Sequence, residues 1–242
     1  MNRRDLLLRL LPGFAATSSM VSCVGTGGNG AMPMQGGGFA LGIDVLRGDN
    51  FAILRGKRVG LITNQTSADG RGTATRLVLQ RALGPALTAL FTPEHGLDGM
   101  EKAGNKIQTR RDNLTGVIAH SLYGSTRKPT PDMLASIDVM LFDLQDIGSR
   151  SYTYISTMVL AMQACGEQGK EFVVLDRPNP LGGLKVQGPP LEQRWKSFVG
   201  QVPIPYVHGM TAGELARMCN GQGWMGARPR LTVVPKIGRA HV

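Results

Sequence analysis

Short apolar runs that end in polar, turn-forming residues recur along this chain. Four such runs occupy residues 59–62, 87–91, 139–142 and 172–175. Each leads into a polar segment rich in Asp, Asn, Pro or Gly, at residues 63–66, 92–96, 143–146 and 176–180. A continuous apolar run of this length is typical of a strand buried on both faces of a parallel sheet. The pattern therefore predicts four parallel strands, each followed by a polar loop.

Helical periodicity fills the intervals between these strands. It covers residues 74–83, 131–137 and 154–168. Alternation of strands and helices predicts an α/β fold in which a parallel sheet carries helices on both faces. Right-handed crossovers place the four polar loops at one edge of the sheet, where open α/β sheets bind ligands. Two long irregular inserts, at residues 97–130 and 181–210, are expected to cover this carboxyl edge, the first with short strands of its own.

Three shorter patterns complete the predicted domain. Residues 43–46 fit a lead-in helix or strand, and residues 231–234 begin like a further strand. Residues 211–218 start a helix, because Glu214 follows Thr211 at the spacing of a capping box.

The first 23 residues resemble an export signal. A twin arginine lies near the start, and the apolar stretch after it is too short to cross a membrane. Residues 20–23 resemble a lipobox, in which Cys23 is lipidated after cleavage; an ordinary secretory signal with an incidental Cys23 is the alternative. Residues 24–38 are Gly-rich and fit a flexible linker. We therefore expect an exported protein, either periplasmic or held at the cell envelope as a lipoprotein.

The last residues have an unusual sequence. Residues 237–242, IGRAHV, are what a common sequencing adapter encodes in one reading frame. We therefore place the domain at residues 39–235 and treat residues 236–242 as a tail. Residues 1–38 are expected to make few contacts with the domain, and residues 237–242 are expected to make none.

Charge and composition indicate one class of partner, anionic polymers or lipid headgroups, and argue against another, nucleic acid. The formal net charge is +10, and it is +8 once residues 1–23, with three arginines and one aspartate, are set aside. An exported basic protein is attracted to anionic wall polymers or lipid headgroups, and general basicity without a specific partner is the alternative. Nucleic acid is not an expected partner, because no basic helix has base-reading spacing and aromatic residues make up only 5% of the chain.

The positions of the cysteines and the sequence of the first loop argue against a disulfide, a metal site and a nucleotide-binding function. Cys165 and Cys219 lie in helical patterns, which favours buried thiols over a disulfide between them. No Cys pair or His-Glu-x-x-His pattern has the spacing of a metal site, so no metal or other cofactor is predicted. The loop at residues 63–72 lacks both GxGxxG and GxxxxGK[ST], which argues against a nucleotide-binding protein.

Five motifs together resemble those of a known family. They are, in chain order, LFTPEHG at 90–96, SLYG at 121–124, FDLQDIGSRSYTY at 142–154, VLDRPNP at 174–180 and HGMTAGELA at 208–216. With these motifs, the chain from about residue 44 to residue 234 resembles the exo-β-N-acetylmuramidase (NamZ-type) family, long described as a domain of unknown function. The resemblance implies a glycoside hydrolase that removes terminal N-acetylmuramic acid from the non-reducing end of peptidoglycan fragments.

The resemblance also implies a domain arrangement. A Rossmann-like N-terminal domain is followed by a smaller C-terminal domain, with the active site in the cleft between them. This chain stops before the second domain and its Pro-Ser-Pro-Asn and Gly-Arg-Gly-Thr-type motifs, so activity is expected of the full-length protein rather than of this chain alone. Muropeptides are the implied partners, and membrane contact is expected only through a lipid anchor. A non-catalytic muropeptide-binding lipoprotein is the alternative function.

Hydrolysis of a glycosidic bond needs an acid for the leaving oxygen and a group that meets the charge at the anomeric carbon. Glu94 is our candidate acid, because burial on a Pro-fixed turn raises a carboxyl pKa; its alternative is to cap the loop. The 2-acetamido group of the sugar can itself attack the anomeric carbon. Asp146, Tyr152 and Tyr154 are candidates to orient that group, and Tyr154 alternatively packs in the helix. Asp143 is expected to cap a backbone group or to pair with Arg150.

N-acetylmuramic acid also carries a lactyl carboxylate, which an Arg side chain binds better than Lys. Arg150 and Arg177 are the candidates, and the alternative for either is an ion pair with Asp143 or Asp176. The other candidates for substrate contacts are Asn64, His95, Asp176, Asn179 and His208, with turn or structural roles as their alternatives.

Overall fold

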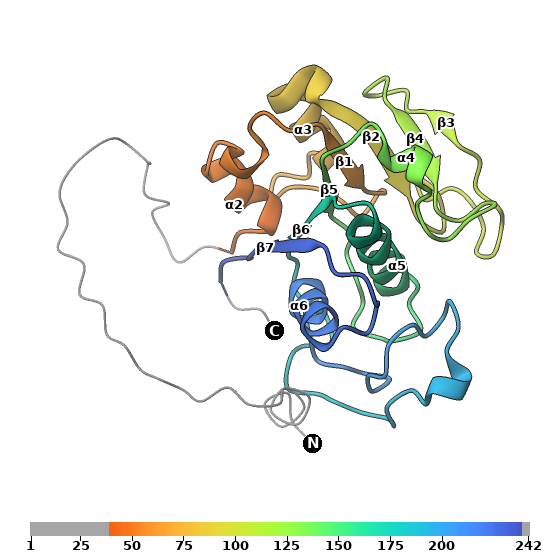
Figure 1. Cartoon of the computed structure of the whole chain (residues 1–242). Helices are drawn as coiled ribbons and strands as arrows, with labels where there is room; N and C mark the ends of the chain where they lie inside the picture. Colours follow the sequence, from red (N-terminus) through yellow and green to blue (C-terminus); the bar gives the residue numbers. More distant parts are fainter. Residues whose placement is uncertain (1–38, 239–242) are drawn as a thin grey trace.

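In the computed structural model, which describes residues 39–238, seven strands form one sheet in the order β3-β4-β2-β1-β5-β6-β7 (Figure 1). The strands are β1 (Val59–Ile62), β2 (Leu87–Thr92), β3 (Arg110–Arg111), β4 (Ile118–Ser121), β5 (Val139–Phe142), β6 (Glu171–Leu175) and β7 (Arg230–Val234). Every neighbouring pair is parallel except β3 with β4. The four predicted strands are confirmed as β1, β2, β5 and β6, and the strand begun at residues 231–234 is confirmed as β7.

The helices also follow the sequence pattern. They are α2 (Gly42–Gly48), α3 (Thr75–Leu83), α4 (Pro131–Leu134), α5 (Tyr154–Glu167) and α6 (Ala212–Gln222), with 3-10 turns at Ala52–Leu54, Gly84–Ala86 and Gln193–Trp195. The lead-in segment is the helix α2, and α4 is shorter than the predicted 131–137. The capping box of α6 is confirmed, because the Thr211 hydroxyl accepts from the Glu214 N–H and the Glu214 carboxylate accepts from the Thr211 N–H.

Two apolar cores lie on opposite faces of the sheet. Met140 and Phe142 of β5 pack in the core that includes α4, α5 and α6, whereas Val139 and Leu141 pack with α2 and α3. Successive side chains of a strand alternate between faces, so a strand covered on both faces needs apolar residues throughout. Full burial of one large apolar side chain is worth about 1.5–3 kcal/mol. The prediction of an α/β sheet with helices on both faces is therefore confirmed.

The short strands predicted within the insert at residues 97–130 are confirmed as β3 and β4, but they belong to the sheet. Its strand β4 extends the sheet by pairing parallel with β2, and β3 pairs antiparallel at the outer edge. Within β4 only Ala119 and Ser121 are buried, while Ile118 and His120 are half-buried. This alternation hid the strand from a search for continuous apolar runs. As a result the sheet has a further strand end at its carboxyl edge, leading into Tyr123.

The second insert is an excursion without a strand. Backbone hydrogen bonds between Gln187 and Val207 close its base, with N···O distances of 3.0 and 2.9 Å. Its outer part exposes large apolar side chains, among them Leu184, which is 85% exposed, and Trp195, which is 64% exposed. Figure 1 shows this excursion, in light blue, extending beyond α6 and away from the sheet.

The two described cysteines are free and buried, as predicted. Burial raises the pKa of the Cys165 thiol and of the Cys219 thiol to about 12 in each case, so both stay protonated at neutral pH. No helix between residues 39 and 238 is long and apolar enough to cross a membrane.

The two ends of the domain meet in one backbone bridge. Ala40 and Ile237 exchange hydrogen bonds, with N···O distances of 3.0 and 2.8 Å. The expectation that the tail contacts nothing is therefore wrong at Ile237. The proposed signal, the linker and Cys23 lie in residues 1–38, outside the described residues.

Candidate functional site

Six strand ends share the carboxyl edge of the sheet, because β1, β2, β4, β5, β6 and β7 run parallel. Contacts between side chains join the loops that follow them. Thr153, in the loop after β5, hydrogen-bonds Glu94 after β2, and Arg177 after β6 pairs with Asp143 after β5. Residues far apart in sequence thus meet at this edge, as the order of strands and helices predicts.

Glu94 lies where the ends of β2 and β4 meet the start of α5. Its Oε2 accepts a hydrogen bond of 2.8 Å from the Thr153 hydroxyl, and its Oε1 accepts one of 2.9 Å from the Gly104 backbone N–H. The hydroxyl of Tyr123 is a third donor to the carboxylate. Because Thr153 is the N-cap residue of α5, the positive end of that helix dipole also favours a negative charge here.

The pKa of Glu94 departs from the expectation. Burial raises this pKa, but the hydrogen bonds from Thr153, Gly104 and Tyr123, with the charge of His95, outweigh burial and hold the pKa below its ordinary value. The predicted rise is therefore wrong for the free protein, because several donors stabilise the charged form. Glu94 is a half-buried, ionised carboxylate at neutral pH.

Tyr123 links Glu94 to an arginine that the sequence analysis did not single out. The guanidinium carbon of Arg127 lies 3.6 Å from the centroid of the Tyr123 ring and 5.2 Å from that of Phe198. The two rings are tilted against each other with centroids 5.8 Å apart. Burial, followed by the hydrogen bond to Glu94, raises the pKa of Tyr123, so this phenol stays a donor. Phe198 belongs to the excursion, which therefore reaches this part of the edge.

Asp143 and Arg177 form a buried ion pair. The Nε–Oδ1 distance is 2.5 Å and the Nη2–Oδ2 distance is 2.9 Å, and both side chains are almost fully buried. Asp143 also accepts a 2.5 Å hydrogen bond from the Thr75 hydroxyl, and Arg177 donates to the Ala68 carbonyl at 2.7 Å. Asp143 is structural, as expected, but its partner is Arg177 and not Arg150. Arg177 therefore forms the ion pair that the sequence analysis gave as its alternative to binding a lactyl carboxylate.

Arg150 fastens the excursion to the loop after β5. Its Nη1 donates to the carbonyls of Pro189 and Ile204, at 3.0 and 2.5 Å. Its backbone N–H donates to the Tyr206 carbonyl at 2.7 Å. No carboxylate in residues 39–238 lies within ion-pair distance of Arg150. The guanidinium therefore holds backbone groups of the excursion in place.

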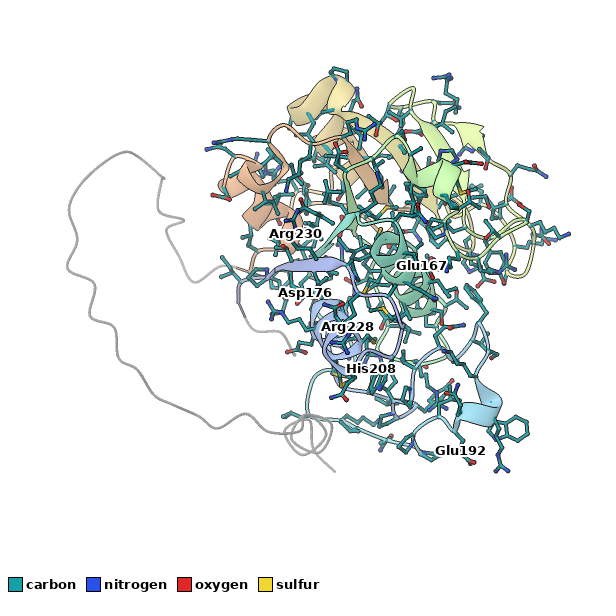
Figure 2. The ribbon with its side chains drawn as sticks, in the orientation of Figure 1. Glu167, Asp176, Glu192, His208, Arg228 and Arg230 are labelled. Atoms are coloured by element: carbon teal, nitrogen blue, oxygen red, sulfur yellow. The ribbon has the colours of Figure 1, made fainter. Side chains whose placement is uncertain are left out.

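Asp176 holds the start of α6, close to which Figure 2 labels it. Its Oδ1 accepts from the Gly213 N–H at 2.8 Å and its Oδ2 accepts from the Thr211 hydroxyl at 2.9 Å. A Cβ on Gly213 would overlap this carboxylate and Val233, so the close approach requires glycine. Burial raises the pKa of Asp176, and the two donors oppose the rise. These contacts agree with a structural role for Asp176, which the sequence analysis gave as its alternative to substrate binding.

Asn64 and Tyr154 share a buried hydrogen bond of 2.7 Å from the amide nitrogen to the phenol oxygen. The amide oxygen of Asn64 accepts from the Thr66 N–H at 2.8 Å, which is a turn role. Burial is the main cause that raises the pKa of Tyr154, which opens α5 and is 1% exposed. Its ring lies 4.6 Å from that of Tyr152, edge to face. Tyr152, which is half-buried, is the more accessible phenol.

Asn179 connects three loops. Its amide oxygen accepts from the Leu181 N–H at 2.9 Å, and its amide nitrogen donates to the Met210 carbonyl at 3.0 Å. Gly148 lies against the same amide with φ of 83°, and a Cβ there would overlap the amide oxygen. Asn179 is 3% exposed, so its polar atoms serve the loops.

Asp146 and His208 face each other with unused polar atoms. Asp146 Oδ2 accepts from the Gly148 N–H at 2.7 Å and lies 3.7 Å from His208 Nε2. His208 Nδ1 accepts from the Met210 N–H at 3.2 Å, so the proton of the neutral ring is on Nε2, directed at Asp146. Asp146 Oδ1 and His208 Nε2 have no hydrogen-bond partner among the described residues. Both side chains are buried, and Figure 2 shows His208 below α6.

His95 is strained and lies next to a small cavity. Its φ of 71° is unusual for a residue with a Cβ, and its Nδ1 is 3.0 Å from the Glu101 carbonyl oxygen. The cavity, of about 120 Å³, is lined by His95, Lys106, Ile107 and Arg110 among others, but not by Glu94. The cavity therefore lies beside the Glu94 site and does not contain it.

Sequence reasoning missed Tyr123, Thr153, Arg127 and Phe198. One signal was available: the motif SLYG follows a short strand, as the other polar loops do. Thr153 was part of the motif before α5 but was not weighed as a partner of Glu94. Nothing in the sequence relates Phe198 to Arg127, because the excursion that carries Phe198 contains a single 3-10 turn and no strand or α-helix to fix its course.

The chain matches the family described as "Exo-beta-N-acetylmuramidase NamZ, N-terminal" over residues 59–240. It is 50% identical over 179 residues to the peptidoglycan beta-N-acetylmuramidase NamZ of Bacillus subtilis (strain 168), and the match covers 74% of this chain and 43% of that protein.

Two crystal structures of DUF1343 family proteins from Bacteroides fragilis NCTC 9343 are similar to this chain. One has 50% identity and a TM-score of 0.77, covering 83% of this chain and 50% of its own. The other has 37% identity and a TM-score of 0.71, covering 82% and 52%. This chain thus spans about half the length of these relatives.

Proposed function

Because the chain belongs to the family of NamZ N-terminal domains, we propose that the full-length protein carrying it is an exo-acting glycoside hydrolase. Its proposed reaction is the release of terminal N-acetylmuramic acid from the non-reducing end of peptidoglycan fragments. The Bacillus subtilis relative, a peptidoglycan beta-N-acetylmuramidase, supports this substrate class at 50% identity. The match includes the part of the chain that holds Glu94 and its donors.

One observation carries the proposal: a half-buried carboxylate stands where three strand ends meet, held from three sides. Cleavage of a glycosidic bond requires a carboxyl group that is fixed in position and can exchange a proton with the leaving oxygen. Glu94 meets the first requirement through its bonds to Thr153, Gly104 and Tyr123, and it is half-buried, so a substrate can reach it. Asp143 and Asp176 are also fixed in position, but both are almost fully buried, which keeps a leaving oxygen away from them.

Protonation of Glu94 must accompany substrate binding. Burial is already the largest single influence on the pKa of Glu94 and acts upward. A sugar that covers the carboxyl group removes more water and competes for its donors, and both changes raise the pKa. We assign Glu94 as the acid that protonates the leaving oxygen, with its proton acquired in the complex.

A second group has to meet the positive charge at the anomeric carbon. The 2-acetamido group of the sugar can do this by attacking the anomeric carbon, if its N–H is held by an acceptor. Asp146 keeps one carboxylate oxygen without a partner among residues 39–238, whereas the Tyr154 hydroxyl is bound to Asn64. We assign this orienting role to Asp146, and Tyr152 remains the second candidate as the more accessible phenol.

The test is a leaving-group comparison on the full-length protein. Glu94→Gln keeps the size of the side chain, and its amide can still accept from Gly104 and donate to the Thr153 oxygen. We expect a loss of about 10²–10⁴-fold in kcat for a poor leaving group. A β-aryl glycoside with a very acidic leaving group should lose least, because it needs little protonation.

Two outcomes would contradict the proposal. An equal, modest loss with both leaving groups would remove Glu94 as the acid. Failure of the folded wild-type protein to cleave any β-muramic glycoside, with muropeptide binding retained, would instead indicate a binding lipoprotein.

We further propose that residues 1–23 direct export and that Cys23 is lipidated. The twin arginine, the short apolar stretch and the lipobox-like residues 20–23 support this. Cells fed a labelled fatty acid should incorporate the label into the wild-type protein and not into Cys23→Ala. Equal labelling, or none in either, would leave an ordinary secretory signal as the interpretation.

A further inference from the structure

We propose that Arg127 binds the lactyl carboxylate of N-acetylmuramic acid and so selects muramic over glucosamine glycosides. The inference rests on the proposed function and adds to it the residue that determines specificity. Tyr123 lies between the two groups concerned. Its hydroxyl donates to the carboxylate of Glu94, and the guanidinium of Arg127 lies over the face of its ring.

Arg127 is held by aromatic rings rather than by an acid. Its guanidinium lies over Tyr123 and within 5.2 Å of the Phe198 centroid, and it makes a long hydrogen bond of 3.5 Å to the Gly124 carbonyl. No carboxylate of residues 39–238 lies within ion-pair distance of it. Stacking fixes the plane of a guanidinium while its edge keeps N–H donors for an anion.

The other two candidates for this role already hold protein groups. Arg177 binds Asp143 through two nitrogens and the Ala68 carbonyl through one of them. Arg150 donates through Nη1 to two carbonyls of the excursion. A bidentate contact that included Nη1 of Arg150 would compete with these bonds, and a lactyl carboxylate at Arg177 would meet the charge of Asp143. Arg127 is the arginine next to Glu94 that can accept a carboxylate without such a loss.

The position also fits the chemistry of the sugar. The lactyl ether is on C3, two ring positions from the anomeric carbon whose glycosidic oxygen Glu94 protonates. A cation separated from Glu94 by one phenol ring therefore lies on the scale of a single sugar residue. N-acetylglucosamine differs from N-acetylmuramic acid only by lacking this ether, so a contact to its carboxylate is a direct means of discrimination.

The experiment compares three β-aryl glycosides with the same leaving group: N-acetylmuramic acid, its lactyl methyl ester and N-acetylglucosamine. In the full-length protein, Arg127→Met keeps the apolar stem on Tyr123 and removes the charge. We expect kcat/KM for the muramic glycoside to fall about 10- to 100-fold, the range of a charge-assisted pair. The ester and the glucosamine glycoside should change by less than about twofold, and Arg127→Lys should be intermediate.

Arg194→Met is the matched control. Arg194 also lies on an aromatic ring, Trp195, at 5.4 Å, but it pairs with Glu192, which Figure 2 shows at the outer end of the excursion. It should leave all three rates unchanged. An equal fall for all three substrates with Arg127→Met would overturn the inference, because a structural role predicts that result.

Calorimetric titration of free N-acetylmuramic acid separates this inference from the proposed reaction. Tighter binding of N-acetylmuramic acid than of N-acetylglucosamine, lost in Arg127→Met, supports the role of Arg127 even if the protein cleaves no glycoside. Equal affinities in wild type, or a preference that survives Arg127→Met and Arg127→Lys in folded protein, overturns it.

Discussion

The ends of β5 and β6 and the ends of β2 and β4 carry the same kinds of side chain, and the protein uses them differently. After β5 and β6, Asp143, Arg177 and Asp176 are almost fully buried and bond to each other or to backbone and hydroxyl groups. After β2 and β4, Glu94 is half-buried and Arg127 has no acid beside it. The first group holds loops together, and the second keeps charges available to a ligand.

This difference shows why an acid at a strand end is not by itself evidence of catalysis. A carboxylate that is almost fully buried and bonded to protein groups cannot reach the leaving oxygen of a substrate. A half-buried carboxylate with neutral donors keeps its charge but can exchange its partners. What separates the structural acids from Glu94 is therefore their burial, and for Asp143 also a cationic partner, since the donors to Asp176 are a hydroxyl and a backbone N–H like those to Glu94.

The largest expected effect is on stability at the β5 and β6 ends. Arg177→Met removes one partner of a buried pair and leaves the charge of Asp143 without compensation, which costs about 3–5 kcal/mol in free energy of unfolding. The half-buried Glu94→Gln should cost less than about 1 kcal/mol, within the range of ordinary surface substitutions. Urea unfolding monitored by circular dichroism measures both changes.

Adding Asp143→Asn to Arg177→Met provides the control for this pair. Neutralising the stranded charge should recover part of the lost stability, because the two substitutions share one interaction. A loss below about 1 kcal/mol for Arg177→Met would show that the two groups of side chains do not differ as described.

The second effect concerns the proton of Glu94. As the acid, Glu94 must be protonated, so kcat/KM falls as pH rises above the pKa of the free protein, which is held below its ordinary value. Thr153→Val removes one donor to the charged form, which raises this pKa. The falling limb of kcat/KM should move to higher pH, while kcat falls only at a still higher pH.

Thr153→Ser is the matched variant, because it keeps the hydroxyl. The Thr153 side chain makes no capping bond to the helix, so valine should leave α5 intact. If kcat/KM stays constant from acid to neutral pH, or if Thr153→Val does not move the limb, Glu94 acts as a carboxylate and not as the acid.

The smallest effect lies at the opposite edge of the sheet, where Asp138 precedes β5 and Arg58 precedes β1. The hydrogen bonds of the Arg58 side chain and backbone, followed by its charge, lower the pKa of Asp138 to about 2. Both side chains are about half exposed, so solvent screening keeps their contribution to stability small.

The sign of its pH dependence follows from the lowered pKa. The stabilisation is present above the pKa of the unfolded chain, near 4, and is lost as pH falls toward 2. Asp138→Asn should therefore lower the stability slightly at pH 7 and not at pH 2, as measured by thermal unfolding at the two pH values. A loss at pH 7 as large as that of Arg177→Met would mean that burial does not explain the contrast.

The sheet was predictable where a strand is apolar throughout. The runs that became β1, β2, β5 and β6 are covered on both faces, so their sequence alone indicates their place. β4 has one half-buried side, and its pattern resembles a loop. Short strands were expected in this insert, but their pairing with the sheet was not, and the importance of Tyr123 and Arg127 depends on β4 lying beside β2.

The candidate site was predictable to the level of strand ends but not of partners. Sequence order placed Glu94 and Asp143 at one edge, since parallel strands share it. It could not decide which arginine pairs with Asp143, because Arg150 and Arg177 both follow strands close by. The pKa of Glu94 was predicted in the wrong direction, because three donors from separate loops outweigh its burial.

Gly148 shows how narrowly one backbone position can limit sequence variation. It requires a positive φ, which side chains rarely adopt, and it also has an amide oxygen in the space a methyl group would fill. Relieving one constraint leaves the other, so neither a compensating change at Asn179 nor a more flexible loop would by itself admit alanine. A larger residue at this position would push the loop after β5 away from Asn179. That loop would then lose its contact with the two segments that Asn179 holds, at Leu181 and at Met210. The position is therefore confined to the smallest residue without taking part in any chemistry.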